Sequence, residues 1–273
     1  MGGGRAIYGI DFSGAKDAGN KIWIAKGVPV GESLLIKECF RARDLPNSGK
    51  RVETCLPALV ELIKSNQNAV FGFDFPFGLP RTLVHEETWE DFVLAFPRKH
   101  KSPEAFREAC RQANGGHELK RKTDIEAQTP FSPYNLRLFQ QTYYGISDVL
   151  FPLVRYSIAC ILPFQEPVAG KPWILEICPA STLKKHGLYQ EYKFPVKKDD
   201  RPETRSTILE TIEKAGLLKC RDRQIRQSAI ADRNGDALDS LIAATAAFDA
   251  LRDQAAPTRK HKNLYALEGY VFS

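Results

Sequence analysis

Two aspartates stand where acidic side chains are costly to bury. Asp11 follows the apolar run RAIYGI, and Asp74 follows the run NAVFGF. Each lies where a predicted strand leaves the core and precedes small or turn-forming residues. Burying a lone carboxylate is unfavourable, so such acids usually have a partner or bind a metal. A turn or capping role explains either residue alone equally well. Two such acids in one sheet favour a shared site.

The last strongly helical segment adds two more acids. It begins near Asn234-Gly235 and runs through DALDSLIAATAAFDALRD. At about 100° per residue, Asp232, Asp236 and Asp239 fall on a narrow arc. The same arc continues as small residues: Ala243, Ala247 and Ala250. The helix dipole explains an acid in the first turn, but it does not explain two acids that continue a buried alanine face. We therefore predict that Asp236 and Asp239 point inward.

The chemistry that suits four converging carboxylates is metal binding. Like charges repel unless a cation lies among them, and hard oxygen ligands suit Mg²⁺ or Mn²⁺. Two such ions about 4 Å apart can activate water and stabilise the leaving oxygen in phosphodiester cleavage. We expect Asp11 and Asp239 to hold one metal, with Asp74 and Asp236 completing the pair.

Two glutamates are further candidates. Glu176 lies at the end of the strand-like run PWILEICP, where it is either a fifth metal ligand or a hydrogen-bonding structural residue. Glu268 in EGYVFS is a weaker candidate of the same kind.

The elements that must position these acids follow from periodicity. Three runs (RAIYGIDF, KIWIAKGV and SLLIKECF) read as an antiparallel meander. An amphipathic helix follows within 49–66, then a short buried strand that Pro76 ends, and after residue 165 a strand, a capped helix stopped by Gly216 and the acidic helix. The terminal NLYALEGYVFS is a candidate strand. The order predicts a single α/β domain over 1–273, with an RNase H-like mixed sheet of three antiparallel and then parallel strands, flanked by helices.

Residues 81–165 predict a mainly helical insertion that folds onto this domain. They contain the basic stretch HELKRKTD and the aromatic-rich PFSPYNLRLFQQTYYG. Basic and aromatic groups together can hold phosphates and stack bases, although a solvated charged face beside an ordinary core is the commoner explanation. The residues expected to contact substrate are Ser13, Arg121, Lys122 and Asp124.

Composition restricts the class of protein. No apolar run approaches the roughly 18 residues of a membrane span, and no signal peptide is visible in MGGGRAIYGID. Six widely spaced cysteines suggest reduced, mostly buried thiols, so we expect a cytoplasmic protein. The net charge of +6 is compatible with a nucleic-acid partner but does not require one.

Five segments carry a resemblance to a known family. They are GIDFSGA (9–15), GFDFPFGLP (72–80), LEICPAS (175–181), GDALDSLIAA (235–244) and EGYVFS (268–273), and they resemble the DUF429 family, described as predicted nucleases of RNase H-like fold. The acids also resemble the RuvC-like resolvase arrangement, which implies catalytic roles for Asp11, Asp74, Asp236 and Asp239. The second acid here is Asp where those resolvases usually have Glu, which shortens its reach. RuvC-like enzymes often act as dimers, so the resemblance also raises the expectation of a homodimer, although the sequence identifies no interface.

The sequence therefore predicts a Mg²⁺- or Mn²⁺-dependent nuclease that acts on DNA or RNA. Phosphoryl transfer is an alternative, since sugar kinases and actin-like ATPases share this fold and GIDFSGA resembles their phosphate-binding hairpin. The four-acid pattern and the absence of a second fold repeat argue against it. A non-catalytic member of the fold that binds nucleic acid or protein is the third alternative.

Overall fold

The strands pair in one mixed sheet. The computed structural model describes residues 5–193, 200–253 and 262–273. Its strands are β1 (Ile7–Asp11), β2 (Trp23–Val30), β3 (Ser33–Arg41), β4 (Val70–Phe73), β5 (Cys160–Leu162), β6 (Trp173–Ile177), β7 (Leu218–Lys219) and β8 (Val271–Phe272). Across the described residues the strand order is β5-β6-β4-β1-β2-β3-β7, and β8 pairs with β6.

The first three strands are antiparallel neighbours, as the meander predicted. β4 then lies parallel to β1, and β6 lies parallel to β4. β5 and β8 both run parallel to β6, and β7 runs parallel to β3. This confirms the predicted α/β class: one sheet of antiparallel and then parallel strands, flanked by helices and consistent with an RNase H-like fold.

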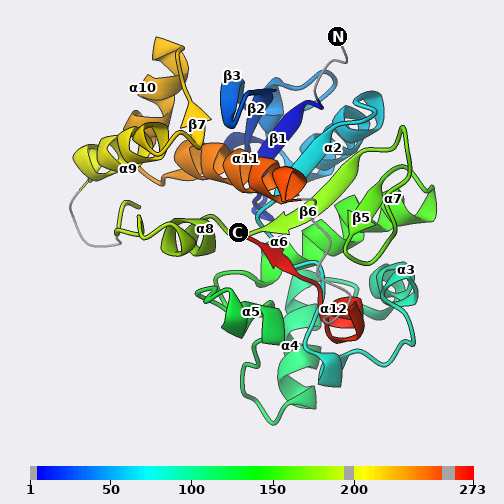
Figure 1. Ribbon diagram of the computed structural model, residues 1–273. Coiled ribbons are helices and arrows are strands. Elements are labelled where there is room, and N and C mark those ends of the chain that lie inside the picture. Colours follow the sequence, from blue (N-terminus) through cyan, green and yellow to red (C-terminus); the bar gives the residue numbers. More distant parts are fainter. Residues whose placement is uncertain (1–4, 194–199, 254–261) are drawn as a thin grey trace.

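The helix α11 (Asp236–Arg252) crosses one face of the sheet and contacts β1, β2 and β4 (Figure 1). Glycines allow this close approach. A Cβ atom on Gly9 would lie 2.1 Å from the backbone oxygen of Ser240, and one on Gly72 would lie 3.0 Å from that of Ala243. Small residues on both surfaces therefore bring the helix backbone down onto the two central strands.

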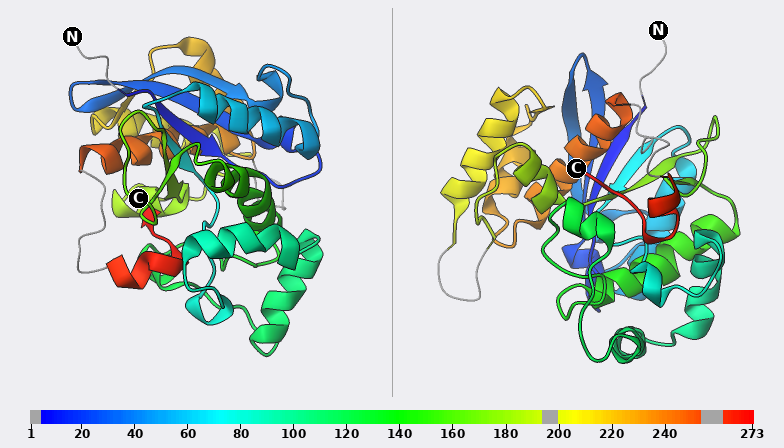
Figure 2. Two further views of the ribbon diagram at one scale, coloured as in Figure 1. Left: turned by 90° about the vertical axis from the view of Figure 1, so that its right-hand side faces the viewer. Right: turned by 60° about the horizontal axis from the view of Figure 1, so that its bottom comes forward.

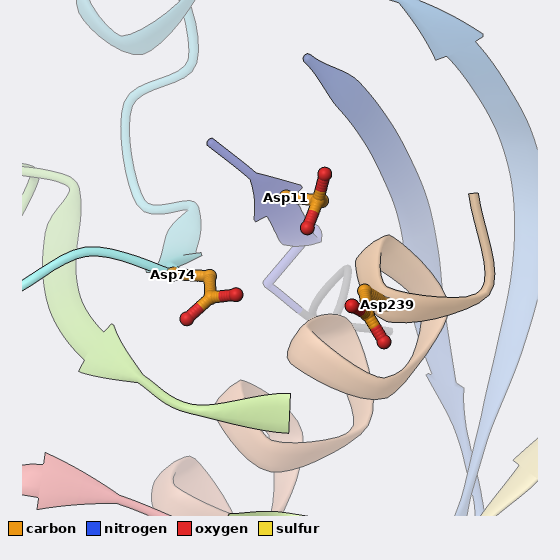
Figure 3. A group of neighbouring side chains, drawn as sticks. All are labelled: Asp11, Asp74 and Asp239. Atoms are coloured by element: carbon orange, nitrogen blue, oxygen red, sulfur yellow. The ribbon is translucent and has the colours of Figure 1, made fainter. Parts of the chain in front are cut away.

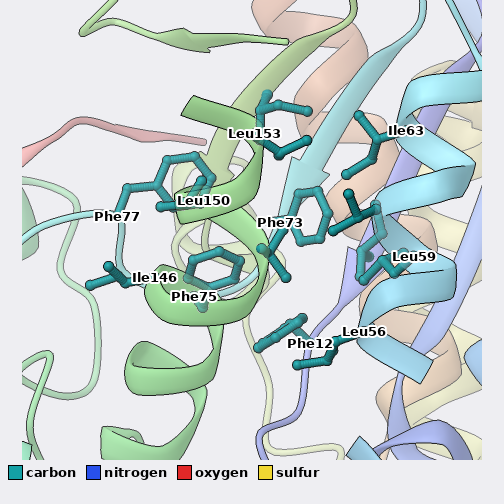
Figure 4. Packing of buried hydrophobic residues seen from close by; sticks show 14 of the residues in the cluster. Phe12, Leu56, Leu59, Ile63, Phe73, Phe75, Phe77, Ile146, Leu150 and Leu153 are labelled. Atoms are coloured by element: carbon teal, nitrogen blue, oxygen red, sulfur yellow. The ribbon is translucent and has the colours of Figure 1, made fainter. Parts of the chain in front are cut away.

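The opposite face of the sheet carries an aromatic core (Figure 4). The helix α2 (Val52–Ser65) packs there through Leu56, Leu59 and Ile63, with Pro57 tolerated near its start. Phe73 at the end of β4 and Phe75 just beyond it have ring centroids 5.6 Å apart. Side chains of successive strand residues point to opposite faces, so Phe73 joins this core while Gly72 faces α11.

The insertion supplies the rest of that aromatic core. Its helices are η2 (Arg81–Leu83), α3 (Trp89–Lys99), α4 (Pro103–Ala113), α5 (Lys122–Glu126), α6 (Phe139–Tyr144), the π-helical η3 (Gly145–Leu150) and α7 (Phe151–Arg155). The insertion is helical, as predicted, but its predicted end at residue 165 is wrong. Residues 160–162 form β5, which pairs with β6 and belongs to the sheet.

The C-terminal part adds the helices α8 (Pro179–Lys185), α9 (Pro202–Lys214), α10 (Arg223–Ala231) and α12 (Lys262–Glu268). Of these, α8 and α10 contact α11, and α9 contacts α10 and β7. The segment NLYALEGYVFS, a candidate strand in the sequence, is mostly helical. The helix α12 extends to Glu268, and only Val271–Phe272 form a strand. Figures 1 and 2 show α12 beside the insertion, where it contacts α3 and α5.

Two short elements lie within predicted turns and loops: α1 (Ala18–Lys21) and η1 (Ala42–Asp44). All six cysteines are free, and five of them are buried. Among the described residues, no helix is long and apolar enough to cross a membrane.

Candidate metal centre

Three aspartates converge at the carboxyl ends of two parallel strands (Figure 3). Asp11 is the last residue of β1, Asp74 follows β4, and Asp239 lies in the first turn of α11. One carboxylate oxygen from each lies within 4.8 Å of the others. Asp11 and Asp239 are only 7% and 1% exposed. The structure therefore brings together three of the four predicted acids in a largely buried cluster.

Strand register explains the convergence of Asp11 and Asp74. Asp11 shares a sheet face with Gly9, and Asp74 continues the face of Gly72 beyond the end of β4, because side chains alternate along a strand. The backbone N–H of Asp74 donates to the carbonyl of Ile10 at 3.0 Å, which keeps the two chains side by side at this point. Both acids therefore point toward α11.

The start of α11 positions the third acid. Gly235 precedes the helix with a φ of 80°, a conformation that favours glycine. The backbone N–H of Asp239 donates to the Gly235 carbonyl at 2.9 Å. Asp232 ends α10 and does not join the acidic arc of α11. Its carboxylate instead accepts from the backbone N–H of Ala237 at 2.9 Å and stabilises the beginning of the helix.

Asp236 lies beside the three-acid cluster but outside it. Burial is the largest cause of the raised pKa of Asp11, and the negative charge of Asp236 is the next largest. Burial raises the pKa of Asp236 itself to about 6. Among the described residues, the acids that share one ion position are Asp11, Asp74 and Asp239. The predicted division of four acids between two metals stays a prediction.

Burial and mutual repulsion disfavour the ionised forms of these acids. Burial, followed by the charges of nearby acids, holds the pKa of Asp11 well above its usual value. Burial and the neighbouring Asp239 raise the pKa of Asp74 to about 7. A carboxylate whose ionised form is disfavoured gains from any positive charge placed beside it.

A lysine and a tyrosine that the sequence analysis did not identify contact this cluster. The hydroxyl of Tyr192 donates to Oδ1 of Asp239, and the ammonium group of Lys193 pairs with Oδ2. Buried Arg205 donates to the Tyr192 carbonyl at 3.0 Å and to the Ile230 carbonyl at 2.7 Å. This arginine ties the segment that carries Lys193 to the end of α10.

The prediction that Glu176 is a metal ligand is not supported, because Glu176 is committed to a buried ion pair. Its carboxylate accepts from both terminal nitrogens of Arg121 and from the backbone N–H of Phe77. Arg121 also donates to the carboxylate of Asp124 and to the carbonyl of Glu268. All five guanidinium N–H groups are thus engaged within the protein.

This network corrects the expected roles of the basic insertion residues. Arg121 is 1% exposed and has no N–H group left for a phosphate, and Asp124 is its partner. The side chain of Lys122 is exposed outside the cavity lining, while its backbone N–H donates to Glu268 at 2.7 Å. Glu268 also accepts from the backbone of Arg81. These residues join the insertion, β6 and the C-terminal segment.

A cavity of about 550 Å³ lies in front of the acids. Its lining includes Asp11, Asp74, Asp236 and Asp239, together with Ser13. The Ser13 hydroxyl accepts from the backbone N–H of Ala15 at 3.3 Å. Residues of the insertion and residues 189–193 also line the cavity. Small-molecule sites have volumes of about 300–1,000 Å³, so the acids form one wall of a cavity large enough for a ligand.

Comparisons of the chain with family models, with curated proteins and with solved structures find no match. The resemblance to the DUF429 family therefore stays a prediction.

Proposed function

We propose that this protein is a divalent-metal-dependent hydrolase that cleaves phosphodiester bonds of nucleic acid. The observation that carries the proposal is the convergence of Asp11, Asp74 and Asp239 within 4.8 Å on the wall of a cavity. Oxygen ligands on opposite sides of a divalent ion, each about 2.0–2.6 Å from it, lie about 4–5 Å apart. The three carboxylates therefore fit a single hard cation.

The charge of the site supports the same proposal. Four aspartates gather around one half-exposed lysine, so the cluster keeps a negative balance that a Mg²⁺ or Mn²⁺ ion would neutralise. Such an ion would supply an activated water and polarise the phosphate. Asp236 lines the same cavity beside the three-acid cluster, so its carboxylate could accept the proton of an attacking water.

The nucleic-acid substrate is proposed from three further observations. The acids lie at strand ends of an RNase H-like sheet, and their order along the chain resembles that of RuvC-like nucleases. The net charge of +6 favours a polyanion. The cavity lining also includes Arg137, which is exposed.

Thermal unfolding with and without Mn²⁺ tests the metal site. The wild type is expected to gain stability from Mn²⁺, and Asp11→Asn is expected to lose that gain. Asn keeps the shape of the side chain but removes the charge that attracts the ion. Asp253→Asn, at the far end of α11, is the matched control. An unchanged Mn²⁺ shift in Asp11→Asn would count against the site.

Hydrolysis of labelled single-stranded, duplex, hybrid and branched substrates tests the reaction. Cleavage is expected with Mg²⁺ or Mn²⁺ in the wild type and in Asp253→Asn, and it should be absent in Asp11→Asn. Cleavage that persists with excess chelator would overturn the proposed metal chemistry.

A further inference from the structure

The cavity lining also includes aromatic and basic side chains that metal binding does not use, and we call Phe131, Arg137 and Tyr189 the wall. Phe131 and Arg137 come from the loop between α5 and α6, and Tyr189 follows α8. All three line the same cavity as the acids. Tyr189 lies about fifty residues after Arg137 in the sequence, so the fold brings two distant segments to one cavity.

Each aromatic ring has a cation over one face. The Arg137 guanidinium lies 5.6 Å from the centroid of Phe131, and the Lys184 ammonium lies 5.3 Å from that of Tyr189. Tyr189 is 47% exposed, so part of its side chain is open to a ligand. Lys184 also donates to the carbonyl of Gln128 at 2.7 Å, so it connects the Tyr189 side of the opening to the insertion.

The positive charge of Arg137 is not paired with a carboxylate in the described part of the chain. No carboxylate among the described residues lies within 4.0 Å of its guanidinium group, whereas buried Arg121 nearby has two. An exposed arginine of this kind, stacked on an aromatic ring, can hold a phosphate and support a base at the same time.

The helix that follows Arg137 contacts the chain directly after Asp11. The side-chain amide of Gln141 donates to the carbonyl of Phe12 at 2.6 Å, directly after Asp11. A Cβ atom on Gly14 would lie 2.3 Å from the carbonyl oxygen of Gln140, so α6 is in close contact with the turn after β1. The opening therefore has a defined position relative to the acids.

We infer that this wall binds unpaired nucleotides, so that the substrate is single-stranded at the point of cleavage. The inference rests on the proposed function. Bases of a duplex stack on one another and cannot present their faces to Phe131 and Tyr189, whereas unpaired bases can. A cavity of about 550 Å³ admits a nucleotide but not a double helix. The phosphate next to the stacked base would then reach the buried acids.

Fluorescence anisotropy tests the inference on the full chain, with Ca²⁺ as a probe metal. The ligands are a labelled single strand of about 12 nucleotides, as DNA and as RNA, and a hairpin duplex of the same composition. The single strand is expected to bind at least tenfold more tightly than the duplex. A comparison of the affinities for the DNA strand and the RNA strand shows which nucleic acid the wall binds more tightly.

Two variants and two matched controls locate the binding. Tyr189→Ala is expected to weaken single-strand binding about tenfold. Arg137→Ala is expected to weaken it and to reduce the salt dependence by about one phosphate contact. Tyr156→Ala and Arg155→Ala remove exposed side chains of the same types at the end of α7, outside the cavity lining, and are expected to bind like the wild type.

The outcomes separate this inference from the proposed function. If Mn²⁺ still stabilises the protein but Tyr189→Ala and Arg137→Ala bind like the controls, the wall has no such role. Equal affinity for duplex and single strand would also overturn the inference. If the two variants lose single-strand binding but Mn²⁺ has no effect on the wild type, the wall is correct and the proposed metal chemistry is wrong.

Discussion

The ammonium group of Lys193 pairs with Oδ2 of Asp239, inside a cluster of four aspartates. Desolvation disfavours the charged ammonium, but Asp239 raises the pKa of Lys193 well above its usual value. The same positive charge lowers the pKa of Asp11 and Asp74, against the effect of burial. Lys193 therefore acts as an internal counterion, and a metal ion bound to the same oxygen must compete with it.

This competition predicts the effect of Lys193→Met. Metal-free protein should lose stability, because four acids remain without their cation. Mn²⁺ affinity should rise about tenfold, which corresponds to about 1.4 kcal/mol of removed competition. Calorimetric titration with Mn²⁺ measures the affinity, and Lys101→Met, at an exposed position in the insertion, is the control. Weaker Mn²⁺ binding in Lys193→Met would show instead that the lysine supports the metal.

The raised pKa of Asp74 predicts an unusual dependence of stability on pH. Asp74 has a pKa of about 7 in the folded chain and about 3.9 when unfolded. Between these values the folded state holds a proton that the unfolded state has released, so the stability of metal-free protein should fall as pH rises from about 4 to 7. Asp236, raised to about 6, adds to the fall up to that pH.

Urea unfolding in chelator across this pH range measures the slope. Asp74→Asn should reduce the slope, because the amide does not titrate while Asp236 still does, whereas Asp253→Asn should leave it unchanged. Mn²⁺ affinity of the wild type should rise through the same range as the ligands lose protons. Stability that increases steadily from pH 4 to 7 without metal would contradict the raised pKa values.

The buried network around Arg121 predicts a purely structural effect. Arg121→Ala leaves Asp124 and Glu176 buried without their cation, and breaking a buried pair in this way costs about 3–5 kcal/mol. The loss of unfolding free energy should be equal with and without Mn²⁺. Glu176→Gln, which keeps the shape and leaves Arg121 with Asp124, should cost less. If Arg121→Ala has normal stability but is no longer stabilised by Mn²⁺, Arg121 and Glu176 belong to the metal site after all.

The sequence predicted the acids of the site because each lies at a position that local pattern defines. Apolar runs end at Asp11 and Asp74, and strand alternation together with parallel pairing then places both on one face. Asp239 follows from the alanine-lined face of α11, which close packing over Gly9 requires. These are short-range rules, so one sequence was enough.

Other parts of the site depend on contacts between distant segments. Arg121 pairs with Glu176, 55 residues away, and that pairing turned two expected functional residues into structural ones. Lys193 lies in a stretch without helical or strand periodicity, and long-range contacts of Tyr192 with Arg205 and Asp239 bring it to the site. β5 and β7 have three and two residues, too few for a periodic signal.

The contact between Gly9 and α11 predicts that helix packing sets the spacing of the acids. In Gly9→Ala the new Cβ would lie 2.1 Å from the Ser240 oxygen and the Ala244 nitrogen, so α11 must move away from β1. Overpacking of this kind costs about 1–3 kcal/mol. The displacement also carries Asp239 away from Asp11, so Mn²⁺ affinity should fall as well.

Gly72→Ala provides a graded comparison on the same face. Its Cβ would meet the Ala243 oxygen at 3.0 Å and Cγ1 of the Ile177 side chain at 2.7 Å, so its clash with the helix backbone is milder than that of Gly9→Ala. The loss of stability and the loss of Mn²⁺ affinity should therefore both be smaller than in Gly9→Ala. Unfolding by urea and calorimetric titration with Mn²⁺ measure the two quantities separately. If Gly9→Ala is destabilised but binds Mn²⁺ like the wild type, the packing of α11 on Gly9 does not set the spacing of the acids, and this prediction is wrong.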